Sequence, residues 1–231
     1  MAIERLTSGV PGLDKMIEGG FVKGSSVLLS GTPGSGKTTL AMQFLIEGAS
    51  NSGEPSMFIS FEEGLELIRE NFTRFGWSID DLERQGKLVL VQKDATLVST
   101  LLDNDLGQLQ DILERVGAKR VVIDSVSVMN ESSDKVTRQT LARLVDFLRA
   151  KGCTTLFVHE RSVAAVDELK YESIDFLFDG LILLSRMRTG NSFRQILRVP
   201  KMRYTKIMPK IVPVHISDNG VAVHPEMSVF E

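Results

Sequence analysis

Cysteine is almost absent from this sequence, which has one, Cys153, among 231 residues. An intramolecular disulfide is therefore impossible, and a reducing compartment is expected. Long apolar runs are missing as well, and none approaches the roughly 20 residues that a membrane-spanning helix needs. The N-terminal residues show no signal-peptide pattern. Together these absences predict a soluble, cytoplasmic protein that does not insert into a membrane.

Acidic residues are absent from one long segment of an otherwise acidic chain. The formal net charge is -3, which argues against a general nucleic-acid-binding protein. Residues 186–210, called the basic segment below, nevertheless contain eight basic residues and no Asp or Glu. If the chain contacts a polyanion, we expect the contact at this segment.

A glycine-rich stretch at residues 31–38 fits the phosphate-loop pattern G-x-x-x-x-G-K-[ST]. It follows an apolar strand expected at 26–30 and precedes a helix expected at 39–49, so backbone N–H groups and the helix start can surround a phosphate. A glycine-rich turn without a ligand is the alternative. A dinucleotide fingerprint is excluded, because its third glycine would fall at Thr39. The expected nucleotide-binding residues are Gly31, Thr32, Pro33, Gly34, Ser35, Gly36, Lys37, Thr38 and Thr39.

Strands and helices alternate along most of the chain, and only strands are expected after Gly180. This order predicts an α/β fold, with a mainly parallel sheet flanked by helices on both faces and a C-terminal antiparallel extension. Asp218-Asn219-Gly220 predicts a hairpin between the last two strands. The length fits one domain, residues 1–231. The strands are expected at 26–30, 56–61, 87–92, 120–124, 154–159, 181–185, 193–199, 211–216 and 221–223.

Three carboxylates lie at the carboxyl ends of predicted strands, and in an open α/β sheet the ligand lies beyond those strand ends. Asp124 is expected to organise Mg²⁺ together with Thr38, with a turn cap as the alternative. Glu62 and Glu63 directly follow the strand expected at 56–61, which we expect to adjoin the strand of the phosphate loop. We expect Glu62 to take a proton from the attacking water, supported by Glu63, while Lys37 contacts the β- and γ-phosphates. The alternative places both glutamates in the first turn of the next helix.

Lys201 and Arg203 flank Met202 near the end of a predicted strand in the basic segment. Side chains alternate along a strand, so the two cations are expected on one face, and the nearby Pro200 is typical of a sheet edge. The pair is expected to act in trans on a neighbouring subunit's nucleotide, like an arginine finger. The alternative is a solvated cationic face. His159 and Glu160 stand at the end of the strand expected beside that of Asp124. Either a polar group there senses the γ-phosphate, or the histidine is purely structural.

The sequence resembles RecA-superfamily ATPases, and specifically a single-domain member of the KaiC-like family named after the circadian-clock ATPase. This resemblance implies ATP and Mg²⁺ binding, ATP hydrolysis by a glutamate pair, and hexameric rings with nucleotide at the subunit interfaces. It rests on Thr7-Ser8-Gly9-Val10-Pro11-Gly12-Leu13-Asp14, residues 31–38, Ser60-Phe61-Glu62-Glu63, Phe75-Gly76-Trp77, Val122-Ile123-Asp124-Ser125, Asp179-Gly180-Leu181-Ile182-Leu183-Leu184 and Lys201-Met202-Arg203.

The sequence departs from the clock protein in three ways. The fold occurs once here instead of twice. Asp175 and Phe176 stand where the clock protein has a phosphorylated Ser/Thr pair, which argues against autophosphorylation at that place. Tyr204 and Ile207 replace the glycine and histidine that usually follow Lys-Met-Arg. The clamp that Lys201 and Arg203 are expected to form in trans around phosphate is therefore expected to be weakened or reshaped.

These observations leave several functions open. The leading one is a Mg²⁺-dependent ATPase whose ring conformation is read by a protein partner. The alternatives are a nucleotide-dependent switch or scaffold with little turnover, a relative of strand-exchange proteins that binds single-stranded DNA, and a small-molecule kinase, for which no acceptor site is evident. Acidic loops after the strands at 120–124 and 154–159 argue against DNA binding. Those loops contain Glu131, Asp134, Glu160, Asp167, Glu168, Glu172, Asp175 and Asp179.

Overall fold

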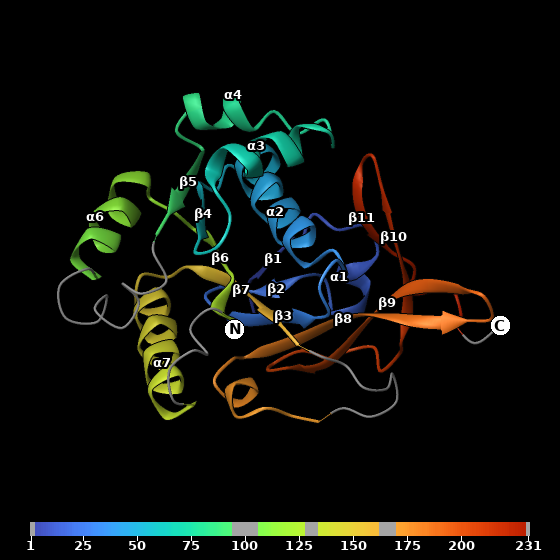
Figure 1. Ribbon diagram of the computed structural model, residues 1–231. Coiled ribbons are helices and arrows are strands. Elements are labelled where there is room, and N and C mark those ends of the chain that lie inside the picture. Colours follow the sequence, from blue (N-terminus) through green and yellow to red (C-terminus); the bar gives the residue numbers. More distant parts are fainter. Residues whose placement is uncertain (1–2, 94–105, 128–133, 162–169, 230–231) are drawn as a thin grey trace.

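The computed structural model describes residues 3–93, 106–127, 134–161 and 170–229, and in this part of the chain one nine-stranded sheet forms the centre (Figure 1). Its strand order is β11-β10-β9-β8-β3-β7-β6-β4-β5. From β8 to β5 all neighbours are parallel, whereas β8, β9, β10 and β11 pair antiparallel. The strands are β3 (Ser26–Gly31), β4 (Ser56–Ser60), β5 (Leu88–Gln92), β6 (Arg120–Asp124), β7 (Thr154–Glu160), β8 (Gly180–Thr189), β9 (Ser192–Met202), β10 (Val212–Ser217) and β11 (Gly220–Val223). A separate small sheet pairs β1 (Arg5–Leu6) with β2 (Phe21–Val22).

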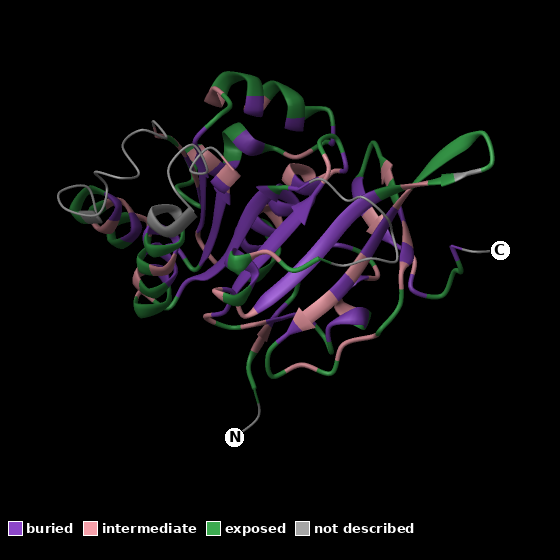
Figure 2. Cartoon of the chain, turned by 60° about the horizontal axis from the view of Figure 1, so that its bottom comes forward, coloured by how far each residue is buried: buried purple, intermediate pink, exposed green. Residues whose placement is uncertain are grey.

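Helices cover both faces of the large sheet. Residues of α1 (Leu13–Met16), α2 (Lys37–Glu47), α3 (Leu65–Thr73) and α4 (Ile79–Arg84) share one buried cluster with Val27 and Leu29 of β3. Residues of α6 (Leu106–Val116) and α7 (Asp134–Ala150) share another with Leu28. Because neighbouring residues of β3 enter different clusters, the sheet is buried on both sides, as Figure 2 shows. The predicted architecture is confirmed.

Several element boundaries differ from the predictions, and one predicted neighbour is wrong. Helix α2 begins at Lys37, inside the phosphate loop, and ends at Glu47, where a π-helical turn (Gly48–Ser52) continues the chain. Strand β4 does not adjoin β3, because β7 and β6 lie between them. Two crossovers from later in the sequence insert these strands, and nothing local in residues 26–61 encodes such an insertion. The hairpin predicted at Asp218-Asn219-Gly220 is present, with Ser217 opposite Gly220.

Pro200 lies in an internal strand, not at the sheet edge that the sequence suggested, since β9 runs between β8 and β10. The pairing of β10 with β9 stops at Val212 opposite Leu197, however, so Pro200 has no partner strand on that side. On its other side the β8–β9 register shifts between Leu181 and Leu183. The missing N–H of proline is therefore tolerated at this irregularity. Within the described residues, no helix has the length and apolar character to cross a membrane.

Arg120, at the start of β6, is fully buried, with 0% of its surface exposed. Its guanidinium donates to Glu54 Oε2 at 2.7 Å and to the carbonyl oxygens of Thr7 and Phe44 at 2.8 and 3.0 Å. It also lies over the Phe44 ring, 4.7 Å from the centroid. The side chain thus joins the N-terminal segment, α2 and β6.

Replacing Arg120 with alanine is expected to lower the free energy of unfolding by about 3–5 kcal/mol, because it leaves Glu54 and two carbonyls without their buried donor. Urea unfolding monitored by circular dichroism measures this loss. Lys23→Ala is the matched control, because it breaks an ion pair with Glu4 that is also 2.7 Å long but is solvent-exposed. We expect little change in the control, and equal losses in the two variants would contradict the buried role of Arg120.

Candidate functional site

The phosphate loop runs from the end of β3 to the start of α2, and its backbone requires glycine at two positions. A Cβ atom on Gly31 would overlap the carbonyl oxygen of Leu184 in the neighbouring strand β8. Gly36 caps α2 with a left-handed φ of 94° and no side-chain hydrogen bond. The first N–H groups of α2 therefore remain available at the loop, which is where a helix binds phosphate.

A pocket of about 360 Å³ lies beside this loop and is called the phosphate-loop pocket below. The carboxyl ends of β4, β6 and β7 form its other wall, as expected for a ligand site in an open α/β sheet. Of the predicted residues, Gly31, Thr32, Pro33 and Ser35 belong to the loop but do not line the pocket. The predicted residues that do line it are Gly34, Gly36, Lys37, Thr38, Thr39, Glu62, Glu63 and Asp124.

Lys37 is only 5% exposed although it is charged. Its ammonium donates to the carbonyl oxygen of Thr32 at 2.9 Å and lies 3.8 Å from Glu160 Oε1. Burial lowers the pKa of Lys37, opposed by the charges of Glu160, Asp124 and Glu62. This buried cation faces several carboxylates across one small pocket, an arrangement that suits binding of a phosphate together with a metal cation.

Asp124 and Thr38 form the oxygen-rich part of the pocket. Burial raises the pKa of Asp124 to about 6, opposed by the Thr38 hydroxyl beside it and reinforced by the charges of Glu62 and Glu63. A carboxylate and a hydroxyl are hard oxygen ligands of the kind that Mg²⁺ accepts when phosphates and waters complete its shell. These two residues therefore fit a Mg²⁺ ion bound beside the phosphate loop.

Glu62 lies just beyond β4, in the same wall of the pocket. Burial raises its pKa, the charges of Glu160 and Glu63 raise it further, and Lys37 opposes them. Glu63 is anchored through its backbone, since its N–H donates to Ser60 Oγ at 3.0 Å and its carbonyl accepts from that hydroxyl at 2.7 Å. A carboxylate with a raised pKa near a phosphate site has the chemistry of a general base.

The structure separates His159 from Glu160, which the sequence treated together. Glu160 lines the phosphate-loop pocket, whereas His159 is buried outside the lining, with Nδ1 3.1 Å from Ser30 Oγ. These contacts favour the structural interpretation of the histidine. The two side chains diverge because successive residues of a strand point to opposite sides.

Burial, reinforced by the charge of Arg161, lowers the pKa of His159 from 6.5 to about 4. Between these values the unfolded chain binds the proton and the folded chain does not. We therefore expect the free energy of unfolding to fall as the pH falls through this range, by about 2–3 kcal/mol between roughly pH 7.5 and 4.5.

We expect His159→Gln to remove this part of the pH dependence of urea unfolding. His215→Gln, at an exposed position of β10, is the control and should leave the dependence unchanged. The same loss of stability at acid pH in wild type and His159→Gln would show that other groups cause it.

Arg74 also lines the phosphate-loop pocket, although no sequence pattern predicted it there. It follows the last residue of α3, eleven positions beyond Glu63 in the chain. Only the packing of α3 against the sheet, through Ile68 and Phe72, brings this arginine to the pocket.

Lys201 and Arg203 lie far from the phosphate-loop pocket of their own chain. Lys201 pairs with Leu181 near the start of β8, whereas the loop follows the carboxyl end of the parallel strand β3. The Lys201 ammonium donates to the carbonyl oxygens of Asp175 and Phe178 at 3.0 and 2.7 Å. Arg203 forms an ion pair with Asp179 at 3.1 Å. Neither cation can serve the site of its own subunit in this arrangement.

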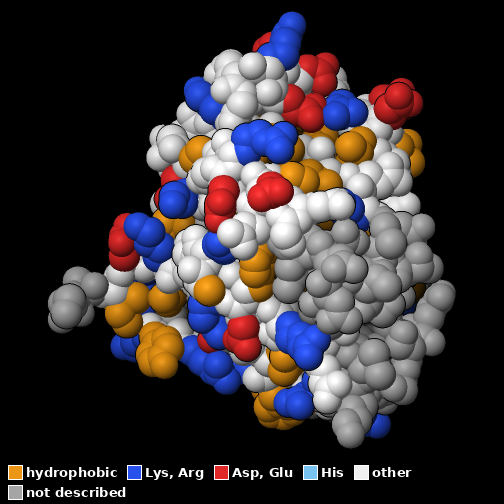
Figure 3. Space-filling view, turned by 90° about the vertical axis from the view of Figure 1, so that its left-hand side faces the viewer, with side chains coloured by type: hydrophobic (Ala, Val, Ile, Leu, Met, Phe, Trp, Pro, Cys, Tyr) orange, Lys and Arg blue, Asp and Glu red, His pale blue; other side chains and the backbone are white. Residues whose placement is uncertain are grey.

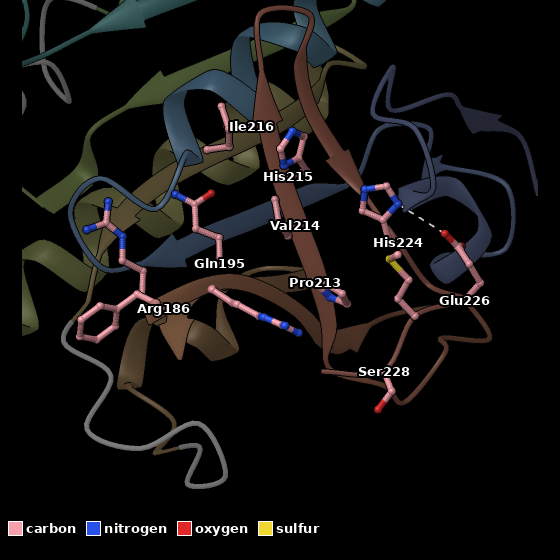
Figure 4. A pocket seen from close by; sticks show the side chains of 12 residues that line it. Arg186, Gln195, Pro213, Val214, His215, Ile216, His224, Glu226 and Ser228 are labelled. Carbon is pink, nitrogen blue, oxygen red and sulfur yellow. Dashed lines mark ion pairs between the residues drawn. The ribbon is translucent and has the colours of Figure 1, made fainter. Parts of the chain in front are cut away.

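A second, larger cavity of about 1010 Å³ lies on the other side of the phosphate loop and is called the bay (Figure 4). Its walls come from the β8–β9 hairpin, β10 and the segment from His224 to Ser228. Arg186 and Gln195 donate to the carbonyl oxygen of Gly34 at 2.8 and 3.4 Å, and Ile216 lines both cavities. The bay therefore adjoins the phosphate loop directly.

The acidic loops that argued against DNA binding are only partly described. Glu131, Asp167 and Glu168 lie outside the described residues, as does the side chain of Asp134. Glu172 and Asp175 form ion pairs with Arg161, and Asp179 pairs with Arg149 and Arg203, so these acids carry compensating cations. Away from its grey area, the face in Figure 3 intersperses both charge signs without a continuous basic surface.

Comparison with known proteins agrees with this geometry. A family model described as "ATPase: KaiC" matches residues 6–228. A UPF0273 protein of Thermotoga maritima is 32% identical over 238 residues, covering 96% of this chain and 97% of the relative. Another from Pyrobaculum aerophilum is 35% identical over 239 residues, covering 96% and 83%.

The crystal structure of a KaiC-like protein from Pyrococcus horikoshii has the same fold, with a TM-score of 0.85 and 33% sequence identity. The match covers 97% of this chain and 100% of that one. The structural match thus covers almost the whole of the fold described above, and the family model spans nearly the same residues. The chain belongs to the KaiC family of ATPase domains.

Proposed function

We propose that this protein is a Mg²⁺-dependent ATPase that works at the subunit interfaces of a cytoplasmic ring, with residues 1–231 acting as one domain. The observation that carries the proposal is the meeting of Lys37, Thr38, Asp124 and Glu62 in one pocket beside the phosphate loop. These groups come from the start of α2 and the ends of the two strands β4 and β6, and they match the parts that phosphoryl transfer to water requires.

In this proposal each group has one task. The backbone N–H groups of the loop and Lys37 bind the β- and γ-phosphates, and Thr38 and Asp124 hold Mg²⁺. The metal ion, when bound, neutralises charge on the phosphate oxygens. Glu62 accepts a proton from the water whose oxygen bonds to the γ-phosphorus, while the bond to the β–γ bridging oxygen breaks and ADP leaves.

The bay supplies space for the nucleoside. It adjoins the loop at Gly34 and Ile216, and its lining includes apolar side chains such as Pro213 and Val214 (Figure 4). Ligand pockets commonly combine such an apolar lining with a few polar groups that fix orientation. We therefore propose that the base and ribose lie here while the phosphates enter the phosphate-loop pocket.

The positions of Lys201 and Arg203 support a ring. They lie at the opposite end of the sheet from their own phosphate loop, so they reach a nucleotide only if it is bound by another subunit. A head-to-tail contact that places one end of a subunit against the other end of its neighbour closes into a ring when the rotation is right. Nucleotide at such interfaces links hydrolysis to ring conformation, which we propose a protein partner reads.

The test combines the mass in solution, with and without ATP and Mg²⁺, with measured phosphate release by the wild-type protein. We expect an oligomer in the presence of ATP and Mg²⁺ and continuous release of phosphate. ATP binding without release would favour the switch or scaffold alternative, and failure to bind ATP would refute the assignment.

A further inference from the structure

Arg74 is the second cation of the phosphate-loop pocket. Lys37 and Arg74 are the lysine and arginine side chains that line it, against the carboxylates of Glu62, Glu63, Asp124 and Glu160 in the described part of the chain. These four acids outnumber the two cations, and a triphosphate adds more negative charge. Mg²⁺ compensates part of this excess, so any further cation inside the pocket has a large electrostatic effect on the γ-phosphate.

Arg74 is free to move toward a phosphate. It is exposed, and its guanidinium carbon lies 4.8 Å from the centroid of the Phe75 ring. Among the described residues this ring is the one partner found for the guanidinium. The backbone beneath it is held by stacked rings, because Phe72, Phe75 and Trp77 pack with centroids 4.9–6.1 Å apart. A flexible side chain thus projects from a fixed base at the rim of the pocket.

The other two cations assigned to phosphate, in contrast, already have partners in their own chain. Two carbonyl oxygens hold Lys201, and Asp179 holds Arg203. Those contacts must be exchanged before either residue meets a neighbour's nucleotide. Arg74 needs no such exchange, since a stacking contact with Phe75 is compatible with rotation of its outer bonds.

We propose that Arg74 contacts the γ-phosphate of the nucleotide bound to its own subunit and stabilises the charge that develops there during hydrolysis, as an arginine finger in cis. This inference rests on the proposed ATPase function. The guanidinium of an arginine has a planar fork of N–H donors, which suits a phosphoryl group with charge on three oxygens. A lysine ammonium lacks this fork and does not match that geometry. The residue would then be catalytic, because it touches the transferred group.

The first test measures kcat and the affinities for ATP and ADP in Arg74→Ala and Arg74→Lys. We expect kcat to fall about 10³-fold in Arg74→Ala, with little recovery in Arg74→Lys. Arg84→Ala is the matched control, since Arg84 is an exposed arginine on α4 paired with Asp81 and lies outside the pocket. Wild-type kcat in Arg74→Ala would overturn the proposal.

The second test shows on which subunit Arg74 acts, by mixing inactive variants in one ring. Subunits with Arg74→Ala and subunits with Glu62→Gln should stay inactive when mixed, because no site then contains both residues. If Arg74 acted in trans, about a quarter of randomly mixed sites would be complete, and recovery to that level would overturn the cis assignment.

Failure of the ATPase assignment is distinguishable from failure of this inference. If the wild type releases no phosphate, the proposed function is wrong whatever Arg74 does. If it binds ATP without hydrolysing it, the ratio of ATP to ADP affinity still reports contact with the γ-phosphate. We expect Arg74→Ala to reduce this ratio about tenfold or more, as for a charge-assisted bond, and an unchanged ratio would refute the contact.

Discussion

Glu62→Gln is expected to slow ATP hydrolysis by about 10²–10⁴-fold while ATP still binds. Glutamine has nearly the same shape as glutamate but cannot accept the proton of the attacking water. Its neutral amide also removes a negative charge that acts on Lys37, so ATP affinity should stay equal or rise. Phosphate release and equilibrium nucleotide binding, measured on the same preparations, separate the two effects.

The pH profile of the wild type gives an independent check of Glu62. Burial and the charges of Glu160 and Glu63 raise the pKa of Glu62, so its base form is lost at a higher pH than that of an ordinary glutamate. Activity should therefore fall as the pH falls through this raised pKa. Glu66→Gln, on the exposed surface of α3 and outside the pocket, is the control and should keep both rate and profile. A wild-type rate in Glu62→Gln would rule out this residue as the base.

Arg203→Ala is expected to lower kcat by about 10³-fold even though Arg203 lies far from the pocket of its own chain. The reason is the proposed head-to-tail ring, in which the end of one subunit that carries Lys201 and Arg203 would face the phosphate loop of the next. Removing the guanidinium removes a positive charge from the neighbour's site and leaves the binding of phosphates by Lys37 intact.

Mixing experiments distinguish this residue from Arg74. In a ring that mixes Arg203→Ala with Glu62→Gln subunits, about a quarter of the sites combine an intact Glu62 with an intact Arg203 from the neighbour. Activity should return to about that fraction, whereas the Arg74→Ala mixture should stay inactive. Arg149→Ala is the control. Arg149 also forms an ion pair with Asp179, at 2.8 Å, so this variant removes a cation from Asp179 but leaves Lys201 and Arg203 in place. A protein that stays monomeric in every condition, with Arg203→Ala fully active, would exclude the interfacial mechanism.

Some residues of the site could be identified from the sequence alone, and others could not. The phosphate loop is contiguous, so residues 31–38 carry both the glycines and the charged group that the loop needs, and they could be identified without coordinates. Glu62 and Asp124 could also be found, because Asp124 ends the apolar strand β6, Glu62 lies two residues beyond the apolar strand β4, and parallel strands end at the same edge of the sheet. The insertion of β7 and β6 between β3 and β4 does not affect this inference, since all of these strands end at that edge.

Residues that reach the site from other parts of the chain could not be assigned to it from the sequence. The sequence could not choose between His159 and Glu160, because which of two successive strand residues faces a pocket depends on where the strand ends relative to the loop. It gave no sign of Arg74, whose place follows from the packing of α3, nor of the bay, which lies between a hairpin, β10 and the C-terminal segment.

By itself, then, the sequence determined the layered α/β architecture, the phosphate loop and the carboxylates at the strand ends, because these depend on local periodicity and on residues close together in the chain. Only the tertiary structure decided that Lys201 and Arg203 lie at the end of the sheet away from their own loop, and that Glu160 and Arg74 line the pocket. Strand order and helix packing bring distant segments together through buried contacts, and no local pattern specifies which segments will meet.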